Sequence, residues 1–152
     1  MNTIRITKQF FFESAHALSG YDGKCKNVHG HSYIFSVTVI GKTLEDNTHP
    51  KNGMVMDFGD LKKIVKKEIV DVYDHATILN SNSKDKELGE ALEQRGHRVI
   101  YSPYQPTSEM MLVEFAAKII DKLPKDIKLH SLKLYETGTS YAEWFAFDNK
   151  DS

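Results

Sequence analysis

The stretch HGHSYIFSVTVIG, residues 29–41, predicts a long β-strand because it is rich in β-branched and aromatic residues and contains no proline. Alternate residues of a strand point to the same side of a sheet, so His29 and His31 are expected to share a face. That face continues with apolar residues, whereas the opposite face is more polar. We therefore expect helices to cover the face that carries the two histidines. Its further members are Tyr33, Phe35, Val37 and Val39.

The remaining elements are expected on both sides of this strand. Residues 3–18 predict a first strand. After the strand at residues 29–41, Asp57 is expected to cap a helix. Residues 76–106 are expected to hold the polar loop NSNS, a short helix ended by Gly96 and a short extended piece, HRVIYS. Thr107 or Ser108 is expected to cap a second main helix that stops at Pro124, before two final strands. This order predicts an α+β fold with an antiparallel sheet covered on one face.

Composition narrows the class of protein. The chain has 152 residues and a formal net charge of −1, which fits one domain and argues against nucleic acid as the main partner. A single cysteine cannot form an internal disulfide. The N-terminus has no apolar signal-peptide region, and no apolar run approaches the roughly 20 residues of a membrane span. We expect a single cytoplasmic domain over residues 1–152 that does not interact with membranes.

Three histidines form a candidate metal site. His16 lies near the end of the first predicted strand, and pairing of the two strands would bring it close to His29 and His31. Three neutral imidazoles with an open fourth position are the ligand set of a catalytic zinc. The alternative is that these are ordinary polar residues at a strand end, satisfied by hydrogen bonds, because a His-x-His pair alone is a weak signal.

The only cysteine, Cys25, lies in a glycine-containing loop between Lys24 and Lys26. Nearby cations lower the pKa of a thiol and favour the thiolate. Asp74 and His75 are adjacent at the end of the first helix and provide the parts of a proton relay for such a thiol. The alternatives are a small, inert cysteine and an ordinary polar pair at a helix end.

Glu136 ends an apolar strand face that contains Leu132 and Leu134. A carboxylate in that place is costly unless it is paired. A ligand with two adjacent N–H donors could pair it bidentately. The alternative is a glutamate exposed to water at the end of the strand.

Six sequence blocks occur in an order that resembles the 6-pyruvoyltetrahydropterin synthase and 6-carboxytetrahydropterin synthase family, over nearly the whole chain. They are FFFESAH, CKNVHGHSY, GMVMDFGDLK, DHATILN, PTSEMM and LYETGTS. The resemblance implies the tunnelling fold, a four-stranded antiparallel sheet with two main helices on one face. It also implies a homo-oligomer in which three subunits form a barrel and two trimers stack into a hexamer, with active sites between subunits.

The same resemblance implies roles for individual residues. His16, His29 and His31 would hold zinc, Cys25 would be the catalytic thiol, and Asp74 with His75 would complete its proton relay. Glu136 would anchor the pterin ring of the substrate, whose pocket Thr107 and Ser108 would line.

The implied substrate is 7,8-dihydroneopterin triphosphate, and two products are possible. One reaction gives 6-pyruvoyltetrahydropterin, and the other also loses acetaldehyde and gives 6-carboxytetrahydropterin, an early step toward queuosine. The long segment between Asp74 and Pro106 resembles the bacterial 6-carboxytetrahydropterin synthases, and this favours the second reaction. A non-catalytic zinc- or pterin-binding module and a purely structural assembly protein are the alternatives from other classes.

Overall fold

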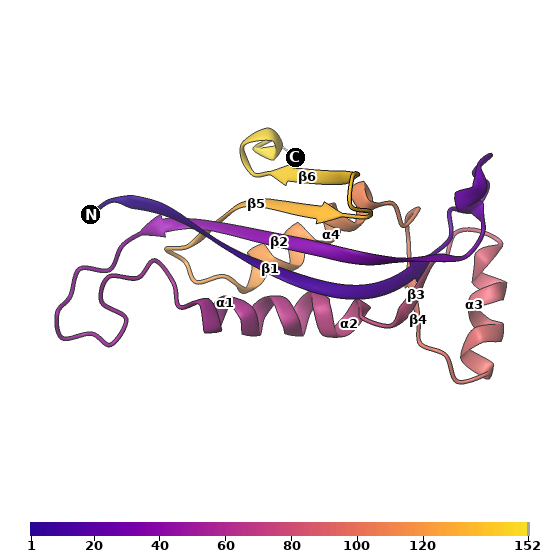
Figure 1. Ribbon diagram of the computed structural model, residues 1–152, viewed down its shortest axis with the longest axis horizontal. Coiled ribbons are helices and arrows are strands. Elements are labelled where there is room, and N and C mark those ends of the chain that lie inside the picture. Colours follow the sequence, from indigo (N-terminus) through magenta and orange to yellow (C-terminus); the bar gives the residue numbers. More distant parts are fainter. Residues whose placement is uncertain (152) are drawn as a thin grey trace.

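Two long antiparallel strands run through most of the length of the molecule (Figure 1). The structure is a computed structural model that describes residues 1–151. Strand β1 (Thr3–His16) pairs with β2 (His29–Lys42) along its whole length, with Phe12 opposite Tyr33 and His16 opposite His29. Both strands begin and end close to the expected residues. The register places the cross-strand partners on the same face, so the predicted meeting of the three histidines is confirmed.

Four further strands complete a mixed six-stranded sheet in the order β4-β3-β1-β2-β5-β6. Strands β5 (Lys128–Tyr135) and β6 (Tyr141–Phe145) extend the antiparallel side. Strand β3 (Ala76–Asn80) pairs in parallel with β1, and β4 (Val99–Ser102) pairs in parallel with β3. The expectation of a four-stranded antiparallel sheet was therefore wrong, although the α+β class is confirmed.

The sequence analysis did not predict strand β3, and the hydropathy pattern of β3 explains why. Its five residues, ATILN, are buried or half-buried throughout and do not alternate between polar and apolar. A strand covered on both faces loses the period of two that identifies a strand in a sequence. Its pairing with Ser14 to His16 of β1 is also a contact between residues more than sixty positions apart, which no local pattern encodes.

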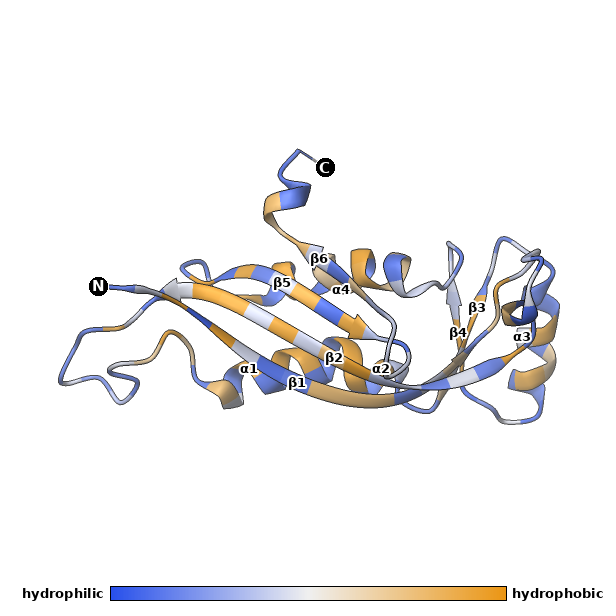
Figure 2. Cartoon of the chain, turned by 45° about the horizontal axis from the view of Figure 1, so that its top comes forward, coloured by the Kyte–Doolittle hydropathy of each residue, from blue (hydrophilic) through white to orange (hydrophobic). Residues whose placement is uncertain are grey.

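One layer of two main helices covers one face of the sheet. Helix α1 (Phe58–Val65) continues through a π-helical segment, η2 (Lys66–Val70), into α2 (Asp71–Tyr73), and α4 (Ser108–Lys122) packs beside it. The Asp57 carboxylate accepts a hydrogen bond from the Gly59 backbone N–H at 2.7 Å, so the predicted N-cap is confirmed. The strands alternate in hydropathy along their length (Figure 2).

Aromatic rings fill the space between the sheet and the helices. Phe35 of β2 and Tyr73 of α2 both contact Phe115 of α4, with ring centroids 5.2 Å and 5.0 Å apart. Phe35 and Phe115 are fully buried. Burying one such ring stabilises a fold by about 1.5–3 kcal/mol, so this contact is a major tie between the layers.

A third helix, α3 (Asp85–Gln94), lies at the end of the molecule beside β3 and β4 (Figure 1). Its Gly89 lets the helix approach the ring of Tyr101, because a Cβ there would lie 2.6 Å from a ring carbon. Gly96 follows the helix with a φ of +86°, which confirms the expected stop. The short helix predicted before Gly96 is therefore confirmed, in addition to the two main helices.

Two short 3₁₀ turns complete the described chain. The first, η1 (Lys24–Lys26), lies in the loop between β1 and β2, and the second, η3 (Phe147–Asn149), follows β6. None of the helices in residues 1–151 combines the length and the apolar character that crossing a lipid bilayer requires.

Candidate active site

The three predicted metal ligands converge at the paired ends of β1 and β2. The Nε2 atoms of His16 and His29 lie 3.1 Å apart, and the potential ligand atoms of all three histidines lie within 4.8 Å of one another. His16 is almost fully buried, and His31 has a side chain that is only 16% exposed. Side chains so close together on the covered face form a compact cluster of three nitrogen donors.

Backbone carbonyls fix the orientation of two of these imidazoles. Nδ1 of His16 lies 2.7 Å from the carbonyl oxygen of Pro106, and Nδ1 of His29 lies 2.7 Å from that of Asn27. A carbonyl only accepts hydrogen bonds, so Nδ1 carries the proton and Nε2 keeps its lone pair. Both lone pairs are then free for a metal ion in the cluster.

The third imidazole has an unused donor site. Nε2 of His31 is buried and forms no hydrogen bond within residues 1–151, although Glu136 Oε1 lies 3.2 Å away. Burial lowers the pKa of His31, which favours the neutral ring that a metal ion binds. A buried polar atom without a partner is costly, and a metal ion would satisfy it. The residues present therefore fit zinc.

Glu136 lies beside this cluster, directly after the last residue of β5. Its Oε1 lies 3.3 Å from Nε2 of His16 and 3.2 Å from Nε2 of His31. The contact with the His16 imidazole is the main cause that lowers the pKa of Glu136, against the opposing effect of burial. Its side chain is 31% exposed, so the carboxylate is both held by the histidines and accessible to a ligand.

The start of α4 lies close to the same cluster through Pro106. Thr107 is the N-cap of α4, and its hydroxyl accepts a hydrogen bond from the Met110 backbone N–H at 3.2 Å, so Thr107 rather than Ser108 caps the helix. Ser108 is buried, and its hydroxyl has no hydrogen-bond partner among residues 1–151. Of the two residues predicted to line a ring pocket, Ser108 is the one with an unused polar atom.

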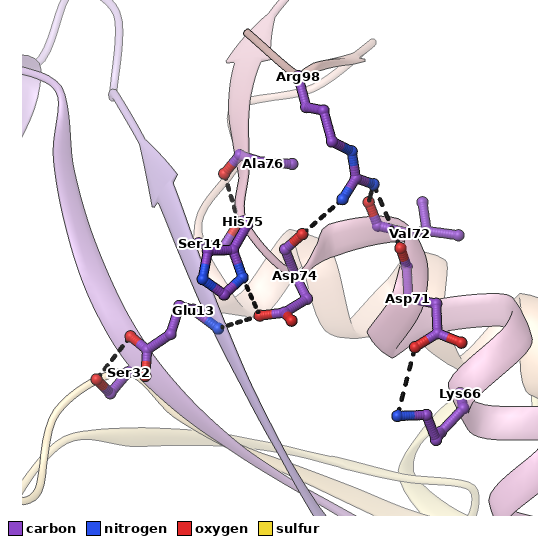
Figure 3. Close-up of polar contacts among 10 residues, drawn as sticks. All are labelled: Glu13, Ser14, Ser32, Lys66, Asp71, Val72, Asp74, His75, Ala76 and Arg98. Carbon is purple, nitrogen blue, oxygen red and sulfur yellow. Dashed lines mark hydrogen bonds and ion pairs between the residues drawn. The ribbon is translucent and has the colours of Figure 1, made fainter.

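Asp74 and His75 form the predicted pair at the corner between α2 and β3 (Figure 3). Asp74 Oδ1 lies 3.0 Å from His75 Nδ1 and also accepts a hydrogen bond from the Glu13 backbone N–H. This backbone hydrogen bond is the main cause that lowers the pKa of Asp74. A charged Asp74 can hold His75 with the proton on Nδ1 and Nε2 free to accept another proton.

The imidazole of His75 is accessible, with a side chain that is 76% exposed. Ser14 and His31 border the same shallow hollow that His75 lines, together with Glu13, Gly30 and Ser32. These three residues belong to the sheet face opposite the one that carries His16 and Phe12, because they alternate with the buried residues of β1 and β2. The exposed His75 therefore lies next to residues of the uncovered face of the sheet.

Cys25 lies in η1 and is exposed. Its carbonyl oxygen accepts a hydrogen bond from the Leu18 backbone N–H, which ties the turn to the end of β1 near His16. Within residues 1–151 of one chain, its thiol forms no hydrogen bond with Asp74 or His75. The fold brings the three histidines and Glu136 together, but it does not connect Cys25 directly to the predicted relay.

A sequence model described as "6-pyruvoyl tetrahydropterin synthase" matches residues 5–146. The chain belongs to this pterin synthase family. As a member of that family it is an enzyme of the lyase class. The matched range includes every site residue described above.

Relatives of this pterin synthase support the same grouping. A protein of Haemophilus influenzae named 6-carboxy-5,6,7,8-tetrahydropterin synthase is 38% identical over 143 residues, which cover 92% of this chain and 97% of that protein. A Synechocystis protein of the same name is 35% identical over 142 residues, which cover 93% of this chain and 92% of that protein. These matches extend across the whole fold rather than one motif.

Solved structures with the fold of this pterin synthase include one from Wolinella succinogenes and one from Caenorhabditis elegans. An uncharacterized protein from Wolinella succinogenes has a TM-score of 0.78 at 19% identity, covering 95% of this chain and 99% of that one. The 6-pyruvoyl tetrahydropterin synthase of Caenorhabditis elegans has a TM-score of 0.66 at 24% identity, covering 95% of this chain and 96% of that one. At these identities the likeness shows the shared fold alone.

The sequence analysis did not identify two residues that contact the candidate site of this synthase. The Tyr33 ring lies against His31 and His16, with centroids 5.5 Å and 6.4 Å away, and its buried hydroxyl has no hydrogen-bond partner within residues 1–151. Its place on the histidine face could have indicated this role. Arg98 contacts the Asp74 corner from a distant segment, and no pattern in the sequence pointed to it.

Proposed function

We propose that the chain is a zinc-dependent 6-carboxy-5,6,7,8-tetrahydropterin synthase. It would convert 7,8-dihydroneopterin triphosphate into 6-carboxytetrahydropterin with loss of triphosphate and acetaldehyde, a reaction that serves queuosine biosynthesis. The observation that supports it most is the cluster of His16, His29 and His31, in a chain whose full-length relatives carry that enzyme's name.

The three histidines would hold zinc through their Nε2 atoms. When bound there, zinc supplies a Lewis acid that polarises the hydroxyl groups of the substrate side chain and acidifies the neighbouring C–H bonds. The hydrogen bonds of His16 and His29 to backbone carbonyls keep these two rings oriented for that task.

Glu136 would bind the pterin ring. Its carboxylate can accept hydrogen bonds from the 2-amino group and the N3–H group of the pterin, which form an adjacent pair of donors. Its contact with His16 and His31 supports this role, because it places the ring next to the metal site. Thr107 and Ser108 would line the ring pocket from the start of α4.

Cys25 would act as the proton acceptor and donor at the side chain of the substrate. Asp74 would hold His75 in the tautomer that exchanges a proton with the thiol.

A homo-oligomer, as a trimer or a hexamer of two trimers, would bring these groups together. The side chain of His75 is exposed beside Glu13 and Ser32 of the uncovered sheet face, whereas the side chains of His16, His29 and His31 alternate with these residues onto the covered face. One subunit would then supply Asp74 and His75 to the site of its neighbour. We further propose that the enzyme works in the cytoplasm on this small-molecule substrate, without nucleic acid or membrane partners.

Product analysis tests the proposal. Purified, zinc-loaded protein is incubated with 7,8-dihydroneopterin triphosphate, and the products are identified by mass spectrometry together with an assay for acetaldehyde. A carboxypterin with released acetaldehyde is expected. A pyruvoyl product without acetaldehyde would instead show that the protein is a 6-pyruvoyl tetrahydropterin synthase, the activity for which the matching family is named. No turnover by metal-loaded protein would leave a non-catalytic binding module.

A further inference from the structure

The corner between α2 and β3 has an unusual backbone. Among residues 1–151, His75 is the only residue other than glycine with a positive φ, at 61°. This left-handed region is unfavourable for a residue with a Cβ and persists only where surrounding contacts hold it. The corner presents the exposed His75 imidazole beside the Asp74 carboxylate, so the backbone there determines where the imidazole lies.

Strand β1 holds one side of this corner. The His75 backbone N–H donates to the carbonyl oxygen of Glu13 at 2.6 Å, and the Glu13 backbone N–H donates to Asp74 Oδ1 at 2.9 Å. Residue Ala76 then enters the parallel pairing opposite Ser14. These contacts hold Asp74, His75 and the start of β3, but they do not involve the carbonyl groups at the end of the preceding helix.

Arg98 holds the other side (Figure 3). Its Nη1 donates to the carbonyl oxygen of Asp74 at 2.7 Å, and its Nη2 donates to those of Val72 at 2.7 Å and Asp71 at 3.3 Å. The last carbonyl groups of a helix have no partner within the helix and carry partial negative charge. A guanidinium group satisfies several of them at once because its donors are fixed in one plane.

The backbone of Arg98 is fixed as well. Its carbonyl oxygen accepts a hydrogen bond from the Thr77 backbone N–H at 3.1 Å, and Val99 begins β4 directly after it. The backbone of Arg98 thus binds β3, and its side chain binds the end of α2. It reaches this place because α3 and β4, which form the long segment after β3, lie beside the corner.

We propose that Arg98 is a positioning residue for the Asp74–His75 pair. Its guanidinium binds three carbonyl groups at the end of α2, holds His75 in its left-handed conformation and so fixes the imidazole for proton transfer. This role gives the segment between β3 and α4 a function in the reaction. The catalytic part of the inference rests on the proposed function, whereas the structural part does not.

The test compares Arg98→Ala and Arg98→Lys with a matched control, Arg95→Lys. Arg95 is an exposed arginine in the same segment, for which no side-chain contact is found in the described chain. Lysine keeps the charge at position 98 but lacks the planar fork. We expect both Arg98 variants to lower kcat between about tenfold and 100-fold, since a small misplacement of a catalytic group has this effect. KM and bound zinc should change less than twofold, and guanidinium ions should restore part of the kcat of Arg98→Ala.

A kcat of Arg98→Lys equal to that of the Arg95→Lys control would overturn the proposal. Equal losses of kcat, bound zinc and thermal stability would also overturn it, because they would indicate general damage to the fold.

A second measurement does not depend on activity. Hydrogen exchange followed by mass spectrometry on peptides that include Asp74 and His75 should be faster in Arg98→Lys than in the control, with unchanged exchange in β5. If the wild-type protein does not turn over the pterin substrate, the proposed function fails, but this comparison still tests whether Arg98 holds the corner. Unchanged exchange would refute that part independently.

Discussion

The Nε2 atoms of His16 and His29 lie 3.1 Å apart at the paired ends of β1 and β2, each ring being held at Nδ1 by a backbone carbonyl. Two unprotonated ring nitrogens at this distance repel each other unless a proton or a metal ion lies between them. With zinc–nitrogen bonds of about 2.0–2.1 Å, tetrahedral ligation places two ligand nitrogens about 3.3 Å apart. The observed separation is close to that spacing.

The first prediction concerns metal content. We expect about one zinc ion per chain, and its loss in His31→Ala, because two imidazoles remain where three are needed. Metal analysis of the purified variants measures this. His49→Ala is the control, because His49 lies in the exposed loop after β2 and outside the cluster. An unchanged zinc content in His31→Ala would contradict the ligand assignment.

The second prediction separates Cys25 from metal binding. Cys25→Ala should keep its zinc but lose activity by about 10²–10⁴-fold, the usual contribution of a positioned acid or base. Steady-state kinetics and metal analysis on the same sample provide both values. A neighbouring change, Lys26→Gln, controls for disturbance of the turn and should have a smaller effect. Wild-type rates in Cys25→Ala would exclude a role for the thiol in proton transfer.

The third prediction concerns binding of the pterin ring. Glu136→Ala should weaken pterin affinity by about tenfold or more, since hydrogen bonds to a charged group contribute about 1.5–3 kcal/mol. Glu143→Ala is a suitable control, because Glu143 of β6 pairs with Lys133 of β5 and is separate from the histidines. Isothermal titration with a pterin measures the affinities. The anchor role would be refuted by equal affinities for Glu136→Ala and the wild-type protein.

A fourth prediction concerns stability. The hydroxyls of Tyr73 and Tyr104 both donate to Glu114 of α4, the former at 2.6 Å. These contacts connect the end of α2 to the segment that contains Tyr104 and Pro106, and the carbonyl of Pro106 contacts His16. Glu114→Ala should lower the free energy of unfolding by about 1–3 kcal/mol, because it leaves a buried phenol without an acceptor.

Thermal and denaturant unfolding of Glu114→Ala, compared with Tyr73→Phe, checks this. Tyr73→Phe removes one donor without leaving a buried group unpaired and should therefore cost less. A smaller loss in Glu114→Ala than in Tyr73→Phe would show that the carboxylate is not the centre of this network.

Local patterns in the sequence determined much of the hairpin and of the histidine cluster. The alternation in HGHSYIFSVTVIG fixed which side chains face the helices, and so it placed His29 and His31 together on the covered face. Asp57 marked a helix start because a capping carboxylate acts on backbone groups two or three residues away. Such interactions span few residues, so a pattern in the sequence can reveal them.

Only the tertiary structure decided how the distant segments meet. Strands β3 and β4 join the sheet in parallel, the carbonyl of Pro106 orients His16, and Arg98 binds the end of α2. Each of these contacts joins residues more than twenty positions apart and depends on the packing of the whole chain. No periodicity encodes such contacts, because they result from the global balance of burial and hydrogen bonding rather than from local conformational preference.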